Sequence, residues 1–280
     1  MMNCIIDTGG GNRGVFGAGV FERLLDEKIM FDCCIGVSAG SANVITYLAG
    51  QKGRLYRFYH DYAFRKQYMS LYNLIKNGEY ISLDYIYSAI TNSDGEDPLN
   101  FENAKKYKGI MELVATDGET ASPVYLHTDD VIQDDFWCLK ASCAIPFVCK
   151  PVLKNGHTYY DGGISDPVPI DRALELGCDK IVLVISKPEE MRKSSKVDAG
   201  GAKVLKKKNP ALAEKLQSRI DNYNSSLQKA MQLQKEGKCL IVAPRDCCNV
   251  GTLKKTPESI DALYRSGYEE AGKIREFLNK

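Results

Sequence analysis

A unit of apolar strand, glycine-containing turn and helix occurs twice near the N-terminus, and this repetition constrains the fold most strongly. Residues 4–7 are a short apolar run, residues 9–14 are rich in glycine, and residues 15–27 carry apolar side chains at helical spacing. Residues 31–37 are a second apolar run, and residues 39–49 continue as a helix of small and apolar residues. Such alternation of strands and helices indicates an α/β protein.

The alternation continues along the chain. Further strand candidates are residues 111–116, 124–127, 157–160, 180–186 and 240–243. Residues 170–176 have the pattern of a helix between two of these strands. Together they predict a sheet of about six strands.

Two segments depart from this pattern. Residues 54–90 crowd tyrosines onto helical patterns, which favours a helical insertion with half-buried rings over a lid across an apolar site. Residues 187–209 are polar and rich in lysine, which predicts a mobile connection, and a helical stripe of apolar side chains follows Pro210. We predict a catalytic domain over residues 1–186, and an extension over residues 187–280 packed on the same domain.

The glycine-rich segment Gly9-Gly10-Gly11-Asn12-Arg13-Gly14 lies between a predicted strand and a helix. Glycines leave backbone N–H groups accessible and the helix N-terminus adds partial positive charge, so the segment predicts an anion-binding loop. Its spacing also fits a dinucleotide fingerprint, which requires an acidic residue at the far end of the second strand. Asp32 stands at the beginning of that strand instead. Arg13 either adds charge to the loop or braces it.

A second motif, Gly36-Val37-Ser38-Ala39-Gly40, joins the second strand to its helix. The pattern G-x-S-x-G in this context is typical of a nucleophile elbow, in which a sharp turn projects the serine from the sheet edge. The alternative role of Ser38 is that of a helix N-cap. The position between strand and helix favours the nucleophile.

A serine nucleophile needs a base, and the chain has three histidines, His60, His127 and His157. None lies in a turn context that recommends it as the base. Asp161 follows a predicted strand and precedes Gly162 and Gly163, which permit close approach of a substrate or another backbone. The alternative for this Asp-Gly-Gly sequence is a tight β-turn.

The glycine loop, the elbow and the Asp-Gly-Gly turn resemble the motifs of the patatin-like phospholipase family, in the family's order. That family also has an A-S-x-A-x-P segment, present here as residues 141–146. The resemblance implies a three-layer α/β/α fold with a mostly parallel central sheet. It implies hydrolysis of lipid esters by a Ser38–Asp161 dyad through an acyl-enzyme, with the loop of residues 9–14 as the oxyanion hole.

Composition limits the partners. The 37 basic and 36 acidic residues nearly cancel, so no overall field attracts nucleic acid, although contact with a membrane surface through a local patch stays open. The N-terminus has no signal-peptide pattern and no apolar stretch is long enough to cross a bilayer, which predicts a cytoplasmic protein. The ten cysteines predict reduced, buried thiols. The chain contains no C-x-x-C pair, so this signal of a metal site is absent from the sequence.

We therefore predict a carboxylic ester hydrolase that acts on lipid esters and needs no cofactor. Two alternatives stay open: an NAD(P)-dependent oxidoreductase that uses the glycine loop, and a lipid-binding protein of the same fold without turnover. The sequence leaves undetermined the headgroup, the acyl chain and the oligomeric state.

Overall fold

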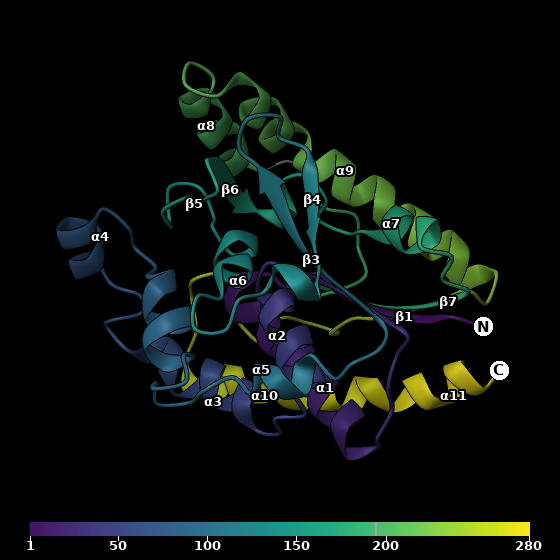
Figure 1. The fold of residues 1–280 in the computed structure, drawn as a ribbon. Helices are drawn as coiled ribbons and strands as arrows, with labels where there is room; N and C mark the ends of the chain where they lie inside the picture. Colours follow the sequence, from purple (N-terminus) through teal and green to yellow (C-terminus); the bar gives the residue numbers. More distant parts are fainter. Residues whose placement is uncertain (194) are drawn as a thin grey trace.

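A single eight-stranded sheet, in the order β5-β6-β3-β2-β1-β7-β8 with β4 paired to β3, forms the centre of the molecule (Figure 1). The computed structural model describes residues 1–193 and 195–280. Strands β3, β2, β1, β7 and β8 run parallel, whereas β4, β5 and β6 add antiparallel pairs at one side. The strands are β1 (Asn3–Asp7), β2 (Cys33–Val37), β3 (Ile110–Asp117), β4 (Pro123–Leu126), β5 (Val152–Lys154), β6 (His157–Asp161), β7 (Lys180–Val184) and β8 (Cys239–Val242).

Helices cover both faces of the sheet, because alternate side chains of each buried strand point to opposite sides. Ile5 packs on one face with α1 and α2, whereas Cys4 and Ile6 pack on the other with α7 and α9. The helices are α1 (Val15–Asp26), α2 (Ala39–Leu48), α3 (Arg54–His60), α4 (Leu71–Asn77), α5 (Phe101–Ala104), α6 (Trp137–Ser142), α7 (Ile170–Glu175), α8 (Lys196–Leu205), α9 (Pro210–Lys235), α10 (Pro257–Glu270) and α11 (Ile274–Asn279). The predicted three-layer α/β/α architecture with a mostly parallel sheet is confirmed.

The chain after residue 187 is joined closely to the rest. Strand β8 pairs in parallel with β7, and α10 crosses α1 at two glycines. A Cβ on Gly19 would lie 2.0 Å from the carbonyl oxygen of Tyr264, and one on Gly267 would lie 2.0 Å from that of Phe16. Only glycines allow the two helix backbones to approach this closely.

Two sequence predictions need correction. The sheet has eight strands rather than about six, and β5 was missed because it has only three residues, which are half-buried or exposed. The predicted connection over residues 187–209 contains the helix α8, which Ser195 caps by accepting a hydrogen bond from the Asp198 N–H. The capped helix α10 is a further helix of the extension, and its bounds were not predicted.

The tyrosine-rich insertion of residues 54–90 divides into α3, α4 and a π-helical turn (Tyr85–Ile90). Tyr59, Tyr62 and Tyr87 are buried in the core, as expected for an insertion that packs on the sheet layer. Helix α4 projects from the body of the molecule (Figure 1). Across the described residues, no helix combines the length and the apolar composition that crossing a bilayer requires.

Candidate active site

Ser38 occupies a strained turn between β2 and α2. Its backbone has φ 56° and ψ −129°, a conformation that non-glycine residues rarely adopt. The flanking glycines let this turn sit against its neighbours, since a Cβ on Gly40 would lie 2.1 Å from the carbonyl oxygen of Asp7 and one on Gly36 would lie 2.5 Å from Cα of Ser41. The local geometry is that of a nucleophile elbow.

Asp161 ends β6 and faces Ser38. Ser38 Oγ donates a hydrogen bond of 2.7 Å to Asp161 Oδ2, and Asp161 Oδ1 accepts one of 2.8 Å from the Gly163 N–H. Both residues are buried, with 8% of Ser38 and 5% of Asp161 exposed. Burial raises the pKa of Asp161, while the Ser38 hydroxyl, the positive charge of Arg219 and the Gly163 N–H oppose the increase. The structure thus brings the two predicted residues together as a buried pair.

The glycine loop follows β1 and packs directly on the elbow. Gly9, Gly10 and Gly11 all have positive φ, and a Cβ on Gly9 would lie 2.3 Å from the carbonyl oxygen of Val37. The N–H of Gly9 donates to Asp7 Oδ1 and that of Asn12 donates to the carbonyl oxygen of Thr252. Among the described residues, the N–H groups of Gly10 and Gly11 have no acceptor. These two are the donors in the loop that a ligand can use.

The remaining loop residues support it. Arg13 Nη1 donates to Thr252 Oγ1 at 3.0 Å, so the arginine does brace the loop. The Gly14 carbonyl accepts a hydrogen bond from Asn43 Nδ2, and a Cβ on Gly14 would lie 2.5 Å from the Tyr59 hydroxyl.

Several residues around the pair were not assigned a role from the sequence. Ser142 Oγ accepts the Ser38 N–H at 2.9 Å and donates to the carbonyl oxygen of Val114 at 2.6 Å. Asp7 Oδ2 accepts a hydrogen bond from Asn43, which links the loop to α2, and burial raises the pKa of Asp7 to about 6. The A-S-x-A-x-P segment contains Ser142 and was the only sequence signal for any of them.

Arg219 on α9 also belongs to this group. Its Nε donates to the Gly163 carbonyl at 2.7 Å, and its charge acts on Asp161. It lies 58 residues beyond Asp161 in a segment without a recognisable motif, so the sequence offered no signal for it.

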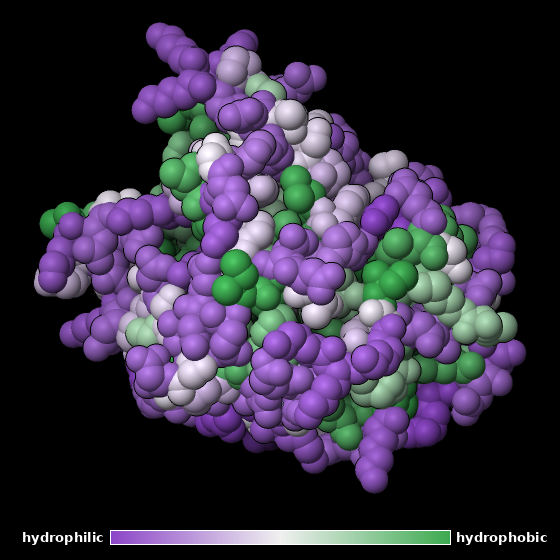
Figure 2. Space-filling view, in the orientation of Figure 1, coloured by the Kyte–Doolittle hydropathy of each residue, from purple (hydrophilic) through white to green (hydrophobic). Residues whose placement is uncertain are grey.

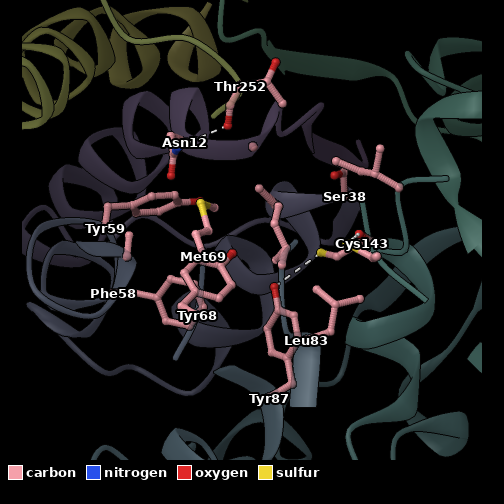
Figure 3. A pocket seen from close by; sticks show the side chains of 16 residues that line it. Asn12, Ser38, Phe58, Tyr59, Tyr68, Met69, Leu83, Tyr87, Cys143 and Thr252 are labelled. Carbon is pink, nitrogen blue, oxygen red and sulfur yellow. Dashed lines mark hydrogen bonds between the residues drawn. The ribbon is translucent and has the colours of Figure 1, made fainter. Parts of the chain in front are cut away.

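Two cavities meet at Ser38. The smaller, of about 40 Å³, is lined mainly by apolar and aromatic side chains from the tyrosine-rich insertion and from the segment around Cys143 (Figure 3). In Figure 3, Ser38 lies at one side of this cavity, and Tyr87 contacts Cys143 with 3.3 Å between Oη and Sγ. The larger, of about 840 Å³, contains both Ser38 and Asp161 in its wall.

The three histidines lie elsewhere. None of them is among the residues that line the two cavities. His60 Nδ1 lies 2.7 Å from Asp61, whereas His127 and His157 are mostly exposed and lie 3.8 Å from Glu112 and Asp117. The acidic residue that would bind the ribose of a dinucleotide is also misplaced. Asp32 precedes β2 and accepts the Asn3 N–H, so it lies at the amino ends of the strands, whereas the glycine loop lies at their carboxyl ends.

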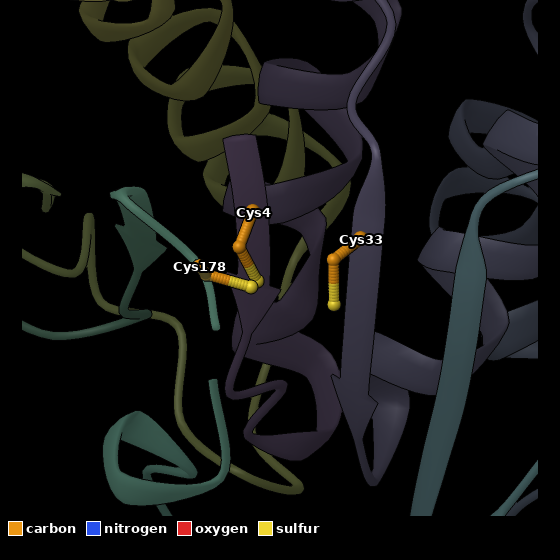
Figure 4. Close-up of side chains that lie close together, drawn as sticks. All are labelled: Cys4, Cys33 and Cys178. Carbon is orange, nitrogen blue, oxygen red and sulfur yellow. The ribbon is translucent and has the colours of Figure 1, made fainter. Parts of the chain in front are cut away.

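Among the described residues, one group of side chains has the spacing of metal ligands, and it consists of three buried thiols. The sulfur atoms of Cys4, Cys33 and Cys178 lie within 4.8 Å of one another (Figure 4). Cys4 and Cys33 belong to the amino ends of β1 and β2, and Cys178 lies two residues before β7, whereas Ser38 follows the carboxyl end of β2. Buried thiols also pack as small apolar groups, and all ten cysteines are free. The cluster therefore takes no part in the arrangement around Ser38.

Fold and site together define a class: an α/β/α protein in which a strained serine hydrogen-bonds to a buried aspartate beside a glycine loop. Residues 8–174 match the family described as Patatin-like phospholipase, and the chain belongs to this family. Residues 209–279 match a second family, described as a domain of unknown function (DUF6363).

Similar proteins include one from Escherichia coli and one from Legionella pneumophila. The chain is 28% identical over 193 residues to the uncharacterized protein YjjU of Escherichia coli (strain K12). This match covers 67% of the chain and 52% of YjjU, so the chain spans about half the length of that relative. The crystal structure of VipD from Legionella pneumophila matches with a TM-score of 0.49 and 15% sequence identity, over 98% of this chain and 67% of VipD.

Proposed function

We propose that this protein hydrolyses carboxylic esters of lipids through an acyl-enzyme on Ser38, with Asp161 as the general base. The observation that carries the proposal is the 2.7 Å hydrogen bond from Ser38 Oγ to Asp161 Oδ2 at the wall of an open cavity. A general base must lie within hydrogen-bond reach of the proton that it removes. A carboxyl group whose pKa is raised by burial is also a stronger base than an exposed one.

The geometry supports a two-step reaction. Ser38 Oγ attacks the ester carbonyl carbon while its proton passes to Asp161 Oδ2. The Gly10 and Gly11 N–H groups stabilise the oxyanion, and the protonated Asp161 then donates its proton to the departing alkoxide. Water attacks the acyl-enzyme by the same route, giving up its proton to Asp161, and the serine is regenerated when Ser38 recovers that proton.

The two cavities support an assignment of the substrate's parts. The smaller, apolar cavity accommodates the acyl side of the ester, and the larger one accommodates the alcohol side. At about 40 Å³ the smaller cavity holds only about three water molecules. A long acyl chain therefore requires the insertion, which supplies Phe58, Tyr68 and Met69 to its wall, to move outward.

The test compares hydrolysis of a p-nitrophenyl acyl ester by the wild type, Ser38→Ala and Asp161→Asn. We expect both variants to lose at least about 10³-fold in kcat, as when a member of a catalytic unit is removed. Matched controls are Ser225→Ala and Asp94→Asn, which change exposed residues and should leave the rate unchanged.

A fluorophosphonate probe tests the same serine without a substrate. The intact mass of the wild type should increase by one adduct located on Ser38, and Ser38→Ala should stay unlabelled. Full turnover by either Ser38→Ala or Asp161→Asn would contradict the dyad, even if the protein proved to be an esterase.

Contact with a lipid surface is a further part of this proposal. Helix α4 exposes apolar side chains, among them Leu71 at 69% and Ile75 at 86%, and Figure 2 shows green atoms where α4 projects. Apolar side chains exposed together are typical of interaction surfaces. We expect the double variant Leu71→Ser and Ile75→Ser to co-sediment less with phosphatidylglycerol vesicles, whereas Leu153→Ser on β5 should bind as the wild type does.

A further inference from the structure

The larger cavity beside Ser38 is walled mostly by residues that follow residue 174, where the match to the patatin-like family ends. Residues between 186 and 193 and between 195 and 201, residues 252 and 253, and the helix α9 form this part of the wall. At about 840 Å³ the cavity has the size of a typical small-molecule site. It therefore offers a binding site that the catalytic motifs do not account for.

The wall of this cavity carries an excess of positive charge. Its five cationic side chains are those of Arg13, Lys187, Arg192, Lys193 and Arg219. Its three carboxylates are those of Asp161, Glu190 and Asp198. Two of the carboxylates are already engaged, since Asp161 bonds to Ser38 and Asp198 lies 3.4 Å from Arg219. The third, Glu190, is exposed.

Apart from the exposed Lys193, three of the cations have no counter-ion among the described residues. Among the residues that the structure describes, no carboxylate oxygen lies within 4.0 Å of Arg13, Lys187 or Arg192. The Nε atoms of Arg13 and Arg192 are buried and have no hydrogen-bond partner there. A buried guanidinium N–H without an acceptor is costly, so these groups favour the binding of an anion.

The cations are also held in place and close to one another. The guanidinium of Arg192 stacks on the ring of Tyr223, with its central carbon 3.4 Å from the ring centroid. Burial lowers the pKa of Lys187, and the neighbouring charges of Arg192 and Arg13 lower it further. A cluster of like charges that persists in the folded protein is preorganised for a ligand of opposite charge.

We propose that Arg192 and Lys187, together with Arg13, bind a phosphate group carried on the alcohol side of the ester, and that the protein thereby selects esters with an anionic headgroup. This proposal rests on the proposed esterase function, because it places the ester carbonyl at Ser38. The planar guanidinium groups can each donate two parallel hydrogen bonds to phosphate oxygens, and Lys187 adds a point charge.

The same wall disfavours a headgroup that ends in a cation. A choline group would meet the surplus positive charge, and Arg192 covers the face of the Tyr223 ring on which it stacks, so this face is not free to receive the choline. A neutral alcohol would leave the buried N–H groups of both arginines unpaired. Of these three headgroup classes, the anionic phosphate ester is the one that satisfies the cluster.

The experiment uses three glycerol esters with the same octanoyl chain: the 3-phosphate, the 3-phosphocholine and the free glycerol form. We expect wild-type kcat/KM to be at least about 10-fold higher for the 3-phosphate than for the other two. Arg192→Met and Lys187→Met should each lower kcat/KM for the 3-phosphate by about 10- to 100-fold and leave the free glycerol form unaffected.

Two further variants control for charge and geometry. Lys207→Met removes the same charge at an exposed position that does not line the cavity, and it should keep the preference. Arg192→Lys retains the charge but loses the planar fork, so its preference should fall between those of the wild type and Arg192→Met. Equal kcat/KM for the three esters in the wild type, or an unchanged preference in Arg192→Met and Lys187→Met, would overturn the anion site while leaving the esterase function intact.

A binding measurement separates this inference from the esterase proposal. Calorimetric titration with inorganic phosphate should detect binding to the wild type and to Ser38→Ala, and Arg192→Met should abolish it.

Inhibition of ester hydrolysis by phosphate that is confined to the 3-phosphate ester identifies the site as a headgroup site. An effect of phosphate on hydrolysis of the free glycerol form would instead identify free phosphate as the ligand and overturn the headgroup assignment. Binding by a chain that cleaves no ester would retain the anion site and reject the esterase function, and absence of binding would reject the site.

Discussion

The two parts of the chain that meet at Ser38 differ in how tightly they are built. The family-matched part, residues 8–174, supplies Ser38, Asp161 and the glycine loop, whose positions are fixed by buried hydrogen bonds and by glycines in contact with backbone atoms. The later part supplies a wide cavity wall. In it, Lys187 and Arg192 have no carboxylate partner among the described residues, and the Nε of Arg192 has no hydrogen-bond acceptor there. This difference agrees with our proposals that the first part carries out the chemistry and that the second selects which ester receives it.

Gly9 gives the strongest test of the tightly built part. Gly9→Ala places a Cβ 2.3 Å from the Val37 carbonyl oxygen, which is too close, so the loop must move away from the elbow. We expect a loss of about 10²- to 10³-fold in ester hydrolysis, the usual effect of displacing an oxyanion donor. Hydrolysis of a p-nitrophenyl ester by the purified variant measures it.

The matched control for this change is Gly50→Ala. Gly50 has a similar φ of 71°, but no atom lies within 4 Å of its added Cβ. Both alanines bear the cost of a positive φ, about 1–2 kcal/mol, so only Gly9→Ala should affect catalysis. Equal activity of the two variants would mean that the close contact between loop and elbow has no catalytic importance.

The same contrast explains what the sequence could predict. Ser38, Asp161 and the loop were recognisable because a sharp elbow, a close backbone approach and a helix N-terminus each demand glycine or another specific residue at a fixed position. Arg192, Lys187 and Arg219 were not, because a cavity wall assembled from a helix and an irregular segment imposes no fixed spacing. The helix α8 was missed for a related reason: Gly200 and Gly201 weaken the helical pattern, while the Ser195 cap and packing of Ala202 stabilise the helix.

Ser142 offers a test of intermediate size within the tightly built part. In Ser142→Ala the buried Ser38 N–H and Val114 carbonyl both lose a partner. We expect the free energy of unfolding to decrease by about 1–3 kcal/mol and turnover of all esters to fall together. Urea unfolding measures the first effect and rates with several esters measure the second.

Ser218→Ala is the control for Ser142. Ser218 Oγ donates only to carbonyls of its own helix near the surface, so its removal should change stability by less than about 0.5 kcal/mol. A Ser142→Ala protein as stable as Ser218→Ala would show that the hydrogen bonds beneath the elbow do not hold it.

Arg219 joins the two parts and should show the smallest effect. Because its positive charge stabilises the Asp161 carboxylate, Arg219→Met should raise the already raised pKa of Asp161 further. The base is active when deprotonated, so kcat/KM increases as pH rises through this pKa, and the variant's increase should occur at higher pH than that of the wild type. At high pH the rates should converge. Arg219→Lys retains the charge and should restore the wild-type profile; if Arg219→Met also kept that profile, the later part of the chain would influence headgroup selection alone and not the base.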